Sequence, residues 1–436
     1  MTENNQEVLL RVENLCQFFK MGKGKLKAVN NVSFDIKKGE VFGLVGESGC
    51  GKTTTGRTII KLYDATSGNV FFKGKRIVAG TLSYKEKIKA LQAEANDKLS
   101  ALEVERDEHI AELSASNPDN KEASTRIKNE YHAKASVVKQ EIQAQIKELR
   151  KQIREANHDQ RNCDKDYAKE QVIKVEEKYA ELLANASEDK LPELKKEYKN
   201  ELHKAKNSRL VTQIQMIFQD PIASLDPRMT VRDIIAEGLI IHGEKDKAVI
   251  DEKVYEMLEL VGLVREHATR YPHEFSGGQR QRIGVARSII MNPDMIIADE
   301  PVSALDVSVQ AQVINLLNEL REKMGLTILF IAHDLSVVKY FSDRIGVMYY
   351  GNLVELTTSE KLFAHPMHPY TKSLLSAIPL PDPIYEKQRK RIVYNPLAEH
   401  DYSVDKPSLR EIESGHFVYC NNAEEAKYKA ELGINE

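Results

Sequence analysis

The chain has 436 residues, enough for one large domain or two to three smaller ones, and its formal net charge of −3 does not favour nucleic acid as a partner. Four cysteines lie far apart without a CxxC pair, which argues against a disulfide framework or a zinc cluster. No stretch approaches the roughly eighteen apolar residues of a membrane span, and the polar N-terminus lacks the features of a secretion signal. We therefore expect a cytoplasmic protein that reaches a membrane through a partner.

Residues 8–80 alternate short β-like runs with turn-rich links, and an apolar run at 41–45 leads directly into GESGCGKT at 46–53. Because residues 52–60 continue as a helix, the glycines fall at a strand-to-helix turn, which is typical of a phosphate-binding P-loop. Such glycines let successive backbone N–H groups point at phosphate oxygens. The predicted nucleotide-binding residues of the loop are Gly46, Glu47, Ser48, Gly49, Cys50, Gly51, Lys52, Thr53 and Thr54.

Two side chains of the P-loop have distinct predicted roles. Lys52 would reach the outer phosphates, and the Thr53 hydroxyl would bind a Mg²⁺ that bridges the β- and γ-phosphates. The aromatic pair Phe18-Phe19 precedes the loop at a distance that could bring one ring beneath a nucleotide base, although core packing explains either ring as well. Phe19 is our candidate for that contact.

From residue 81 to 207 the composition changes to Ala, Lys, Glu and Gln, with almost no glycine. Apolar residues recur at three- and four-residue steps, which predicts long amphipathic helices with narrow apolar seams. A turn signal at 116–120 predicts an antiparallel coiled coil, and breaks near 157–159 and 188–189 predict a third long helix and a short fourth. The alternative, a solvated charged linker without structure, does not account for the repeated seam.

We expect residues 81–207 to form a docking or regulatory arm outside the catalytic core. The segments that flank it resemble adjoining strands of one domain, so the arm would leave and return at nearly one point. Insertions of that kind need not disturb the host fold. A short Gly/Ser linker should therefore be able to replace the whole segment.

After residue 208 the globular pattern resumes, with apolar strands that end in polar residues. The strand MIIADEP, residues 295–301, ends in Asp299 and Glu300. Downstream of a P-loop this is the Walker B arrangement, in which Asp299 supports the Mg²⁺ shell and Glu300 polarises an attacking water. His333, at the end of another strand, could orient that water or contact the γ-phosphate. Gln219, at the end of a third, could bind Mg²⁺ or the water.

These positions make up the predicted reaction site. The predicted catalytic residues are Glu300, His333 and Gln219, and the predicted metal ligands are Thr53, Gln219 and Asp299. Two buried acids can also form a structural ion-pair cluster, but the P-loop in the same chain favours the catalytic interpretation.

A second phosphate-binding device lies at residues 276–279, called here the signature segment. A hydroxyl and two glycines precede a predicted helix, whose N-terminus attracts anions. If both devices serve one nucleotide, they meet across an interface between two such domains. The predicted nucleotide contacts of this segment are Ser276, Gly277, Gly278 and Gln279.

The ordered set GESGCGKT, Gln219, FSGGQ, MIIADEP, SALD and His333 resembles the ATP-binding cassette ATPase family, apart from the insertion and the tail. The resemblance implies an α/β P-loop fold with a mixed core sheet, an antiparallel β subdomain and a helical subdomain. It implies a head-to-tail dimer with ATP between one P-loop and the partner's signature, and it places Asp306 at the nucleotide. The expected division is cassette at 1–80 and 208–360, insertion at 81–207, and C-terminal extension at 361–436.

Residues 214–231, 362–383 and 415–420 narrow the resemblance to ATPase subunits of bacterial oligopeptide, dipeptide and nickel importers. It implies ATP and Mg²⁺ as cofactors and a place on the cytoplasmic face of the membrane. The implied partners are a second ATPase subunit, identical or not, two permease subunits and, indirectly, an extracellular solute-binding protein. Peptide is the expected substrate, with nickel or another small solute left open.

The sequence disfavours three other assignments. Some relatives carry an iron–sulfur centre on a C-terminal cysteine cluster, but Cys420 has no cysteine nearby, so we predict none. DNA-maintenance and repair ATPases also split their cassette with a coiled coil, but theirs is far longer and follows the glutamine loop. A non-hydrolysing regulatory subunit is disfavoured by the intact Lys52, Glu300 and His333.

Overall fold

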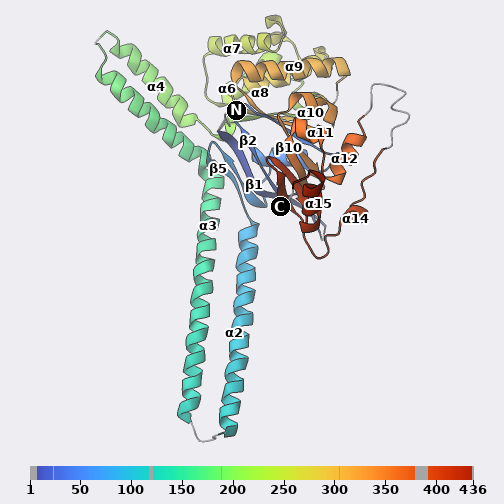
Figure 1. The fold of residues 1–436 in the computed structure, drawn as a ribbon. Coiled ribbons are helices and arrows are strands. Elements are labelled where there is room, and N and C mark those ends of the chain that lie inside the picture. The colour runs from blue at the N-terminus through green and yellow to red at the C-terminus, as the bar shows by residue number, and fades with distance from the viewer. Residues whose placement is uncertain are drawn as a thin grey trace.

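The computed structural model describes residues 7–22, 24–116, 121–187, 189–303, 305–378 and 391–434, which form a two-sheet cassette with long projecting helices (Figure 1). The first sheet is antiparallel, with strand order β2-β1-β4-β5. Its strands are β1 (Val8–Met21), β2 (Gly24–Lys37), β4 (Ser67–Phe72) and β5 (Lys75–Thr81). This confirms the β-rich reading of residues 8–80 and the antiparallel β subdomain.

The second sheet is mixed, with strand order β11-β12-β10-β9-β3-β8-β7-β6. Strands β9, β3, β8, β7 and β6 run parallel, and every residue of β3, β7 and β8 is buried, as the continuous apolar runs require. The strands are β3 (Val41–Val45), β6 (Ile214–Ile217), β7 (Met295–Asp299), β8 (Thr327–Ala332), β9 (Arg344–Tyr349), β10 (Asn352–Thr358), β11 (Ser408–Glu413) and β12 (His416–Cys420).

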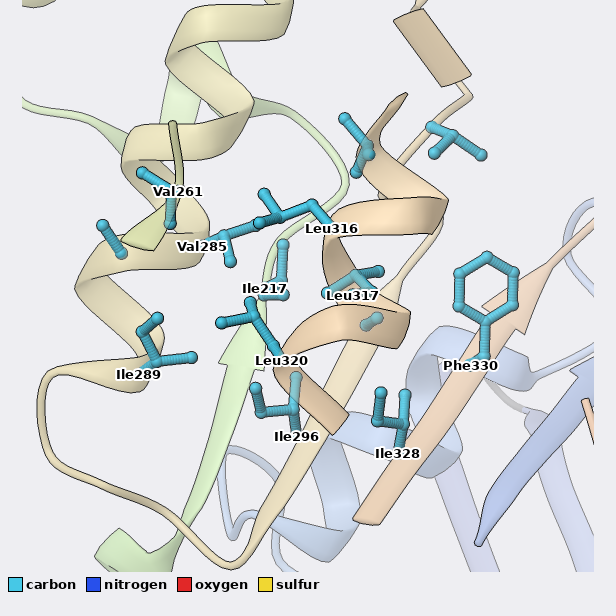
Figure 2. Close-up of a cluster of buried hydrophobic side chains, with 14 of the residues drawn as sticks. Ile217, Val261, Val285, Ile289, Ile296, Leu316, Leu317, Leu320, Ile328 and Phe330 are labelled. Atoms are coloured by element: carbon cyan, nitrogen blue, oxygen red, sulfur yellow. The ribbon is translucent and has the colours of Figure 1, made fainter. Parts of the chain in front are cut away.

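Helices cover this sheet and bury its apolar side chains. Figure 2 shows Val285 and Ile289 of α8 and Leu317 and Leu320 of α9 packed over Ile296 of β7. The α-helices of the cassette and its C-terminal extension are α1 (Lys52–Ile59), α5 (Pro221–Ser224), α6 (Val231–Ile241), α7 (Lys247–Leu260), α8 (Gly277–Ile289), α9 (Val307–Met324), α10 (Leu335–Phe341), α11 (Ser359–Ala364), α12 (Pro369–Ser376), α14 (Pro396–Glu399) and α15 (Asn422–Glu431).

The insertion is helical, as predicted, in α2 (Leu82–Ser116), α3 (Lys121–Ala184) and α4 (Leu191–Asn207). Two hairpins diverge from the cassette: α2 with the first half of α3, and the second half of α3 with α4 (Figure 1). The antiparallel pairing of α2 with α3 brings the Tyr131 hydroxyl within 3.1 Å of His109 Nδ1. The turn was predicted at residues 116–120, of which Ser116 ends α2 and residues 117–120 lie outside the described residues.

The predicted break near residues 157–159 is wrong, because α3 runs through them as one helix of 64 residues. Asn157, His158 and Asp159 lower helix propensity, but tertiary contacts override that preference here. Asp159 pairs with Arg76 of β5 at 2.6 Å, and Gln160 accepts the backbone N–H of Ala79 at 3.0 Å. The break predicted near 188–189 is confirmed, since α3 ends at Ala184 and α4 begins at Leu191.

The middle of α3 packs on the cassette at both sheets. Cys163 of α3 belongs to the buried cluster around Ile77 and Leu210, and the Tyr167 hydroxyl accepts from Gln213 Nε2 at 2.8 Å. The expectation that the insertion leaves and returns at adjoining strands is wrong, because β5 ends one sheet and β6 ends the other. Helix α3 bridges these two sheet edges instead.

The C-terminal extension continues the core sheet through β12, which pairs with β10. Glu355 of β10 is fully buried and accepts the backbone N–H groups of Met367 and His368 at 2.9 and 3.0 Å. Its Oε1 also lies 2.8 Å from His416 Nε2 of β12. Hydrogen bonds to this one carboxylate therefore join the cassette to the start of α12 and to β12.

We expect the stability of this junction to fall at acidic pH because of His368, which caps α12 and is 1% exposed. Burial, with smaller effects of His400 and Lys372, lowers the pKa of His368 from 6.5 to about 3. Between these values the unfolded chain binds a proton that the folded chain does not. The contribution of His368 to the free energy of unfolding is therefore complete above pH 6.5. It decreases as the pH falls toward 3, by about 1.4 kcal/mol per pH unit.

The measurement is urea unfolding at pH 7 and pH 5, followed by circular dichroism, for the wild type and His368→Asn. Asparagine keeps an N-cap but does not titrate. All other groups titrate in both proteins, so the variant should lose less stability between the two pH values. Equal losses would refute the assignment to His368.

Candidate nucleotide-binding and hydrolysis site

The P-loop lies between β3 and α1 in a conformation that requires glycine. Gly46 and Gly51 have φ angles of 149° and 110°, which side chains rarely adopt. A Cβ at Gly46 would come within 2.2 Å of the Met348 carbonyl oxygen, and one at Gly51 within 2.1 Å of that of Ala28. The loop is thus packed so tightly against neighbouring backbone that these two positions admit no side chain.

Lys52, the first residue of α1, turns back into the loop. Its Nζ donates to the carbonyl oxygens of Gly46 at 2.7 Å and Glu47 at 2.9 Å, and the residue is 3% exposed. Among the residues that the structure describes, no carboxylate lies within ion-pair distance of this ammonium. Its charge is therefore not neutralised by an acid, which suits the binding of an anion.

Thr53 and Asp299 form the next part of the site. The Thr53 hydroxyl donates to Asp299 Oδ1 at 2.7 Å, and Asp299 is fully buried at the end of β7. Its Oδ2 has no hydrogen-bond partner within the described ranges. Burial raises the pKa of Asp299, although Thr53 and Arg57 lower it. A buried carboxylate oxygen without a donor fits a hard cation such as Mg²⁺.

Glu300 lies where the ends of three parallel strands meet. Its Oε2 accepts from Gln219 Nε2, after β6, at 3.0 Å and lies 3.1 Å from His333 Nδ1, after β8. The structure thus brings the three predicted catalytic residues together. Glu300 has a φ of 45°, an unusual value for a residue with a side chain and one that is frequent at active sites.

The signature segment begins α8, as predicted. The Ser276 hydroxyl accepts the backbone N–H of Gln279, and Gln279 Oε1 accepts that of Ser276 at 3.1 Å, so the two residues form a capping box. A Cβ at Gly278 would come within 2.5 Å of Val309 in α9, whose N-cap is Asp306. The segment therefore lies beside Asp306, and Ala304 of the SALD motif falls outside the described residues.

Of two further aromatic residues, Tyr370 contacts the P-loop directly, whereas Phe19 packs on Tyr63. Phe19 is half-buried and packs edge-to-face on Tyr63, with ring centroids 5.3 Å apart, so its contact with a base stays a prediction. Tyr370 was not predicted from the sequence, yet its hydroxyl accepts the backbone N–H of Glu47 at 3.1 Å. In the sequence, the segment 362–383 indicates only a family resemblance. No local pattern could predict the contact between Tyr370 and Glu47, because these residues lie 323 positions apart.

The chain combines a P-loop with a parallel strand that leads into two acidic residues, and the carboxylate of Glu300 contacts the amide of Gln219 and the imidazole of His333. These features together define the fold of a P-loop nucleotide-binding ATPase. Residues 29–173 and 181–303 match the family model described as ABC transporter, and residues 354–403 match that of the oligopeptide/dipeptide transporter, C-terminal region. The chain belongs to the ABC transporter family and carries its ATPase domain.

Relatives of similar length include the oligopeptide transport ATP-binding protein OppF of Bacillus subtilis, which is 43% identical over 96% of this chain and 98% of its own. The dipeptide transport ATP-binding protein DppF of Lactococcus lactis is 42% identical, with 98% of each chain covered. Among solved structures, the ATP-binding cassette MJ0796 bound to ADP and Pi aligns with a TM-score of 0.47 and 20% identity, over 80% of this chain and 99% of that one. Of the helices described, none combines the length and apolar character that a membrane span requires.

Proposed function

We propose that this chain is the ATP-hydrolysing subunit of an importer for oligopeptides or dipeptides, bound to permease subunits at the cytoplasmic face of a bacterial membrane. The observation that carries the proposal is near-full-length similarity to oligopeptide and dipeptide transport ATP-binding proteins. The match of residues 354–403 supports it independently. The relatives are oligopeptide and dipeptide transport proteins, so they do not favour the alternative functions of nickel import or DNA maintenance.

The geometry supports a separate role for each residue of the reaction site. Thr53 and Asp299 would hold Mg²⁺, with Gln219 as a further ligand, and the ion would supply positive charge to the phosphates. Glu300 would accept a proton from the water that attacks the γ-phosphate, while His333 and Gln219 hold its carboxylate. Lys52 would leave its carbonyl partners for the phosphates. No iron–sulfur centre is part of the proposal.

The signature segment and Asp306 would act on a nucleotide held by a second ATPase subunit. Ser276, Gly277 and Asp306 are exposed on neighbouring helix starts, and Val307 beside them is 82% exposed. An exposed apolar residue next to an anion-binding helix start suits a surface that a partner covers. That second subunit would be either a copy of this chain or a different ATPase subunit.

A groove of about 350 Å³ between β6 and helices α6 and α8 is our candidate for the permease contact. Its apolar walls include Met216, Phe218, Ile241 and Met291. Ile241 is 71% exposed, and Phe218 directly precedes Gln219. A permease segment with an apolar face would cover Ile241 and Phe218 and lie next to Gln219 of the predicted reaction site.

The proposal predicts little ATPase activity for the isolated subunit, because its signature segment needs a second P-loop. Reconstitution in liposomes with the second ATPase subunit and the permeases should raise ATP turnover, and peptide-loaded binding protein should raise it further. The measurement is phosphate release per subunit over a range of protein concentrations. Full activity in dilute monomer would contradict the shared site, and stimulation by nickel-loaded but not peptide-loaded binding protein would contradict the substrate.

A further inference from the structure

Among the described residues of the C-terminal extension, Tyr370, near the start of α12, makes a hydrogen bond to the P-loop. Its hydroxyl oxygen accepts the backbone N–H of Glu47 at 3.1 Å. Tyr370 is 2% exposed, so water does not compete freely for this hydrogen bond. The bond joins the nucleotide-binding loop to a part of the chain with no predicted role in nucleotide binding.

The peptide group between Gly46 and Glu47 is held from both sides, by Tyr370 at its N–H and by Lys52 at its C=O. In a trans peptide the C=O and the following N–H point in opposite directions. The Gly46 carbonyl accepts from Lys52 Nζ at 2.7 Å, and the Glu47 N–H donates to Tyr370. The φ of Gly46, at the start of this peptide, is 149°, a backbone conformation that residues with a side chain rarely adopt.

Lys52 would have to release this peptide when it turns to a phosphate. Its Nζ bonds to the carbonyls of Gly46 and Glu47 are the lysine's hydrogen bonds to loop oxygens in this structure. Once they are broken, the Tyr370 hydroxyl is the remaining side-chain anchor of the Gly46–Glu47 peptide among the described residues. A loop that keeps its orientation loses less conformational entropy when it binds a ligand.

The hydroxyl itself is held in place by its surroundings. The Tyr370 ring lies 4.3 Å from that of Tyr349 and 5.6 Å from that of Tyr394, centroid to centroid. Its backbone N–H donates to His368 Nδ1 at 3.1 Å, and the N–H of His368 is held by buried Glu355. Burial raises the pKa of Tyr370, so the phenol stays neutral at physiological pH.

We propose that Tyr370 is a positioning residue for nucleotide binding, through which the C-terminal extension holds the P-loop ready for ATP. The proposal depends on ATP binding by the P-loop and not on the transported substrate. The hydroxyl makes no predicted contact with the reacting atoms, so its loss affects affinity rather than the chemical step.

The test is Tyr370→Phe, which keeps the ring and removes the acceptor oxygen. We expect the Kd for ATP, measured with a fluorescent analogue on the isolated subunit, to rise about threefold to tenfold, as loss of one hydrogen bond implies. In the reconstituted complex KM for ATP should rise similarly, with kcat within about twofold of wild type. Without nucleotide, hydrogen exchange of the backbone amides around Glu47, followed by mass spectrometry, should be faster in Tyr370→Phe than in the wild type.

Tyr394→Phe is the matched control, because it removes a hydroxyl from the same ring cluster, and this hydroxyl makes no hydrogen bond to the P-loop in the described part of the chain. It should change none of these values. Glu47→Pro removes the donor instead of the acceptor, and Tyr370→Phe should add nothing further in that background. Unchanged ATP affinity in folded Tyr370→Phe, or equal effects of the two tyrosine variants, would overturn the proposal. Failure of the wild type to bind ATP would instead overturn the proposed function.

Discussion

Replacing Glu300 with glutamine is expected to slow ATP hydrolysis at least about a hundredfold and to preserve ATP binding, since a general base typically contributes that much. Glutamine has nearly the same shape but is not basic, so the proton of the attacking water has no acceptor. The carboxylate is well placed for that role, because its side chain is 12% exposed and contacts both Gln219 and His333.

The measurement compares phosphate release and ATP binding by the reconstituted complex with wild-type and Glu300→Gln subunits. Glu322→Gln is a suitable control, because this glutamate is exposed on α9 and, among the described residues, its hydrogen bond is the one it accepts from Asn318 Nδ2 at 3.5 Å. Turnover equal to wild type in Glu300→Gln would remove Glu300 as the base. Loss of ATP binding would show that the residue holds the nucleotide instead.

The second large effect is expected when the middle of α3 is removed. The sequence alone predicts that a short linker can replace the whole segment 81–207 without loss of the fold. In the structure Ala156 and Cys163 are buried, and Tyr167 packs against the same cluster as Ile77 and Leu210. A fully buried isoleucine or leucine such as Ile77 or Leu210 contributes about 1.5–3 kcal/mol, so exposing this surface removes much of a typical stability of about 5–15 kcal/mol.

We therefore expect three deletions to differ. Replacing residues 92–148, or residues 174–203, with a Gly/Ser linker shortens one hairpin each and keeps the docked part of α3. These two proteins should fold and bind ATP. Replacing residues 82–207 should lower the unfolding temperature sharply or give insoluble protein.

Thermal unfolding by circular dichroism and binding of a fluorescent ATP analogue check all three. A stable, ATP-binding protein without residues 82–207 would show that the α3 contact is dispensable. Loss of folding in either shortened hairpin would show that the projecting parts belong to the cassette. We propose that, within residues 81–207, the two projecting hairpins serve as the docking or regulatory arm.

The sequence by itself determined the chemistry of the site. The P-loop, the acids after β7 and the cap of α8 are each encoded within a few residues, because glycine conformation, strand burial and helix capping are local properties. The amphipathic spacing likewise predicted helices in the insertion, though not their number. Strand ends of a parallel sheet meet at one edge, which is why Gln219, Glu300 and His333 could be placed at one site.

Only the tertiary structure decided how the remaining parts attach to this site. Helix α3 continues through residues 157–159 because Arg76 and Ala79, about eighty residues earlier, supply its partners. Strand β12 joins the core sheet at β10, and Tyr370 reaches Glu47 from the far end of the chain. These bonds join residues whose separation along the chain leaves no periodic or local pattern, so they become visible only once the hydrophobic cores have packed.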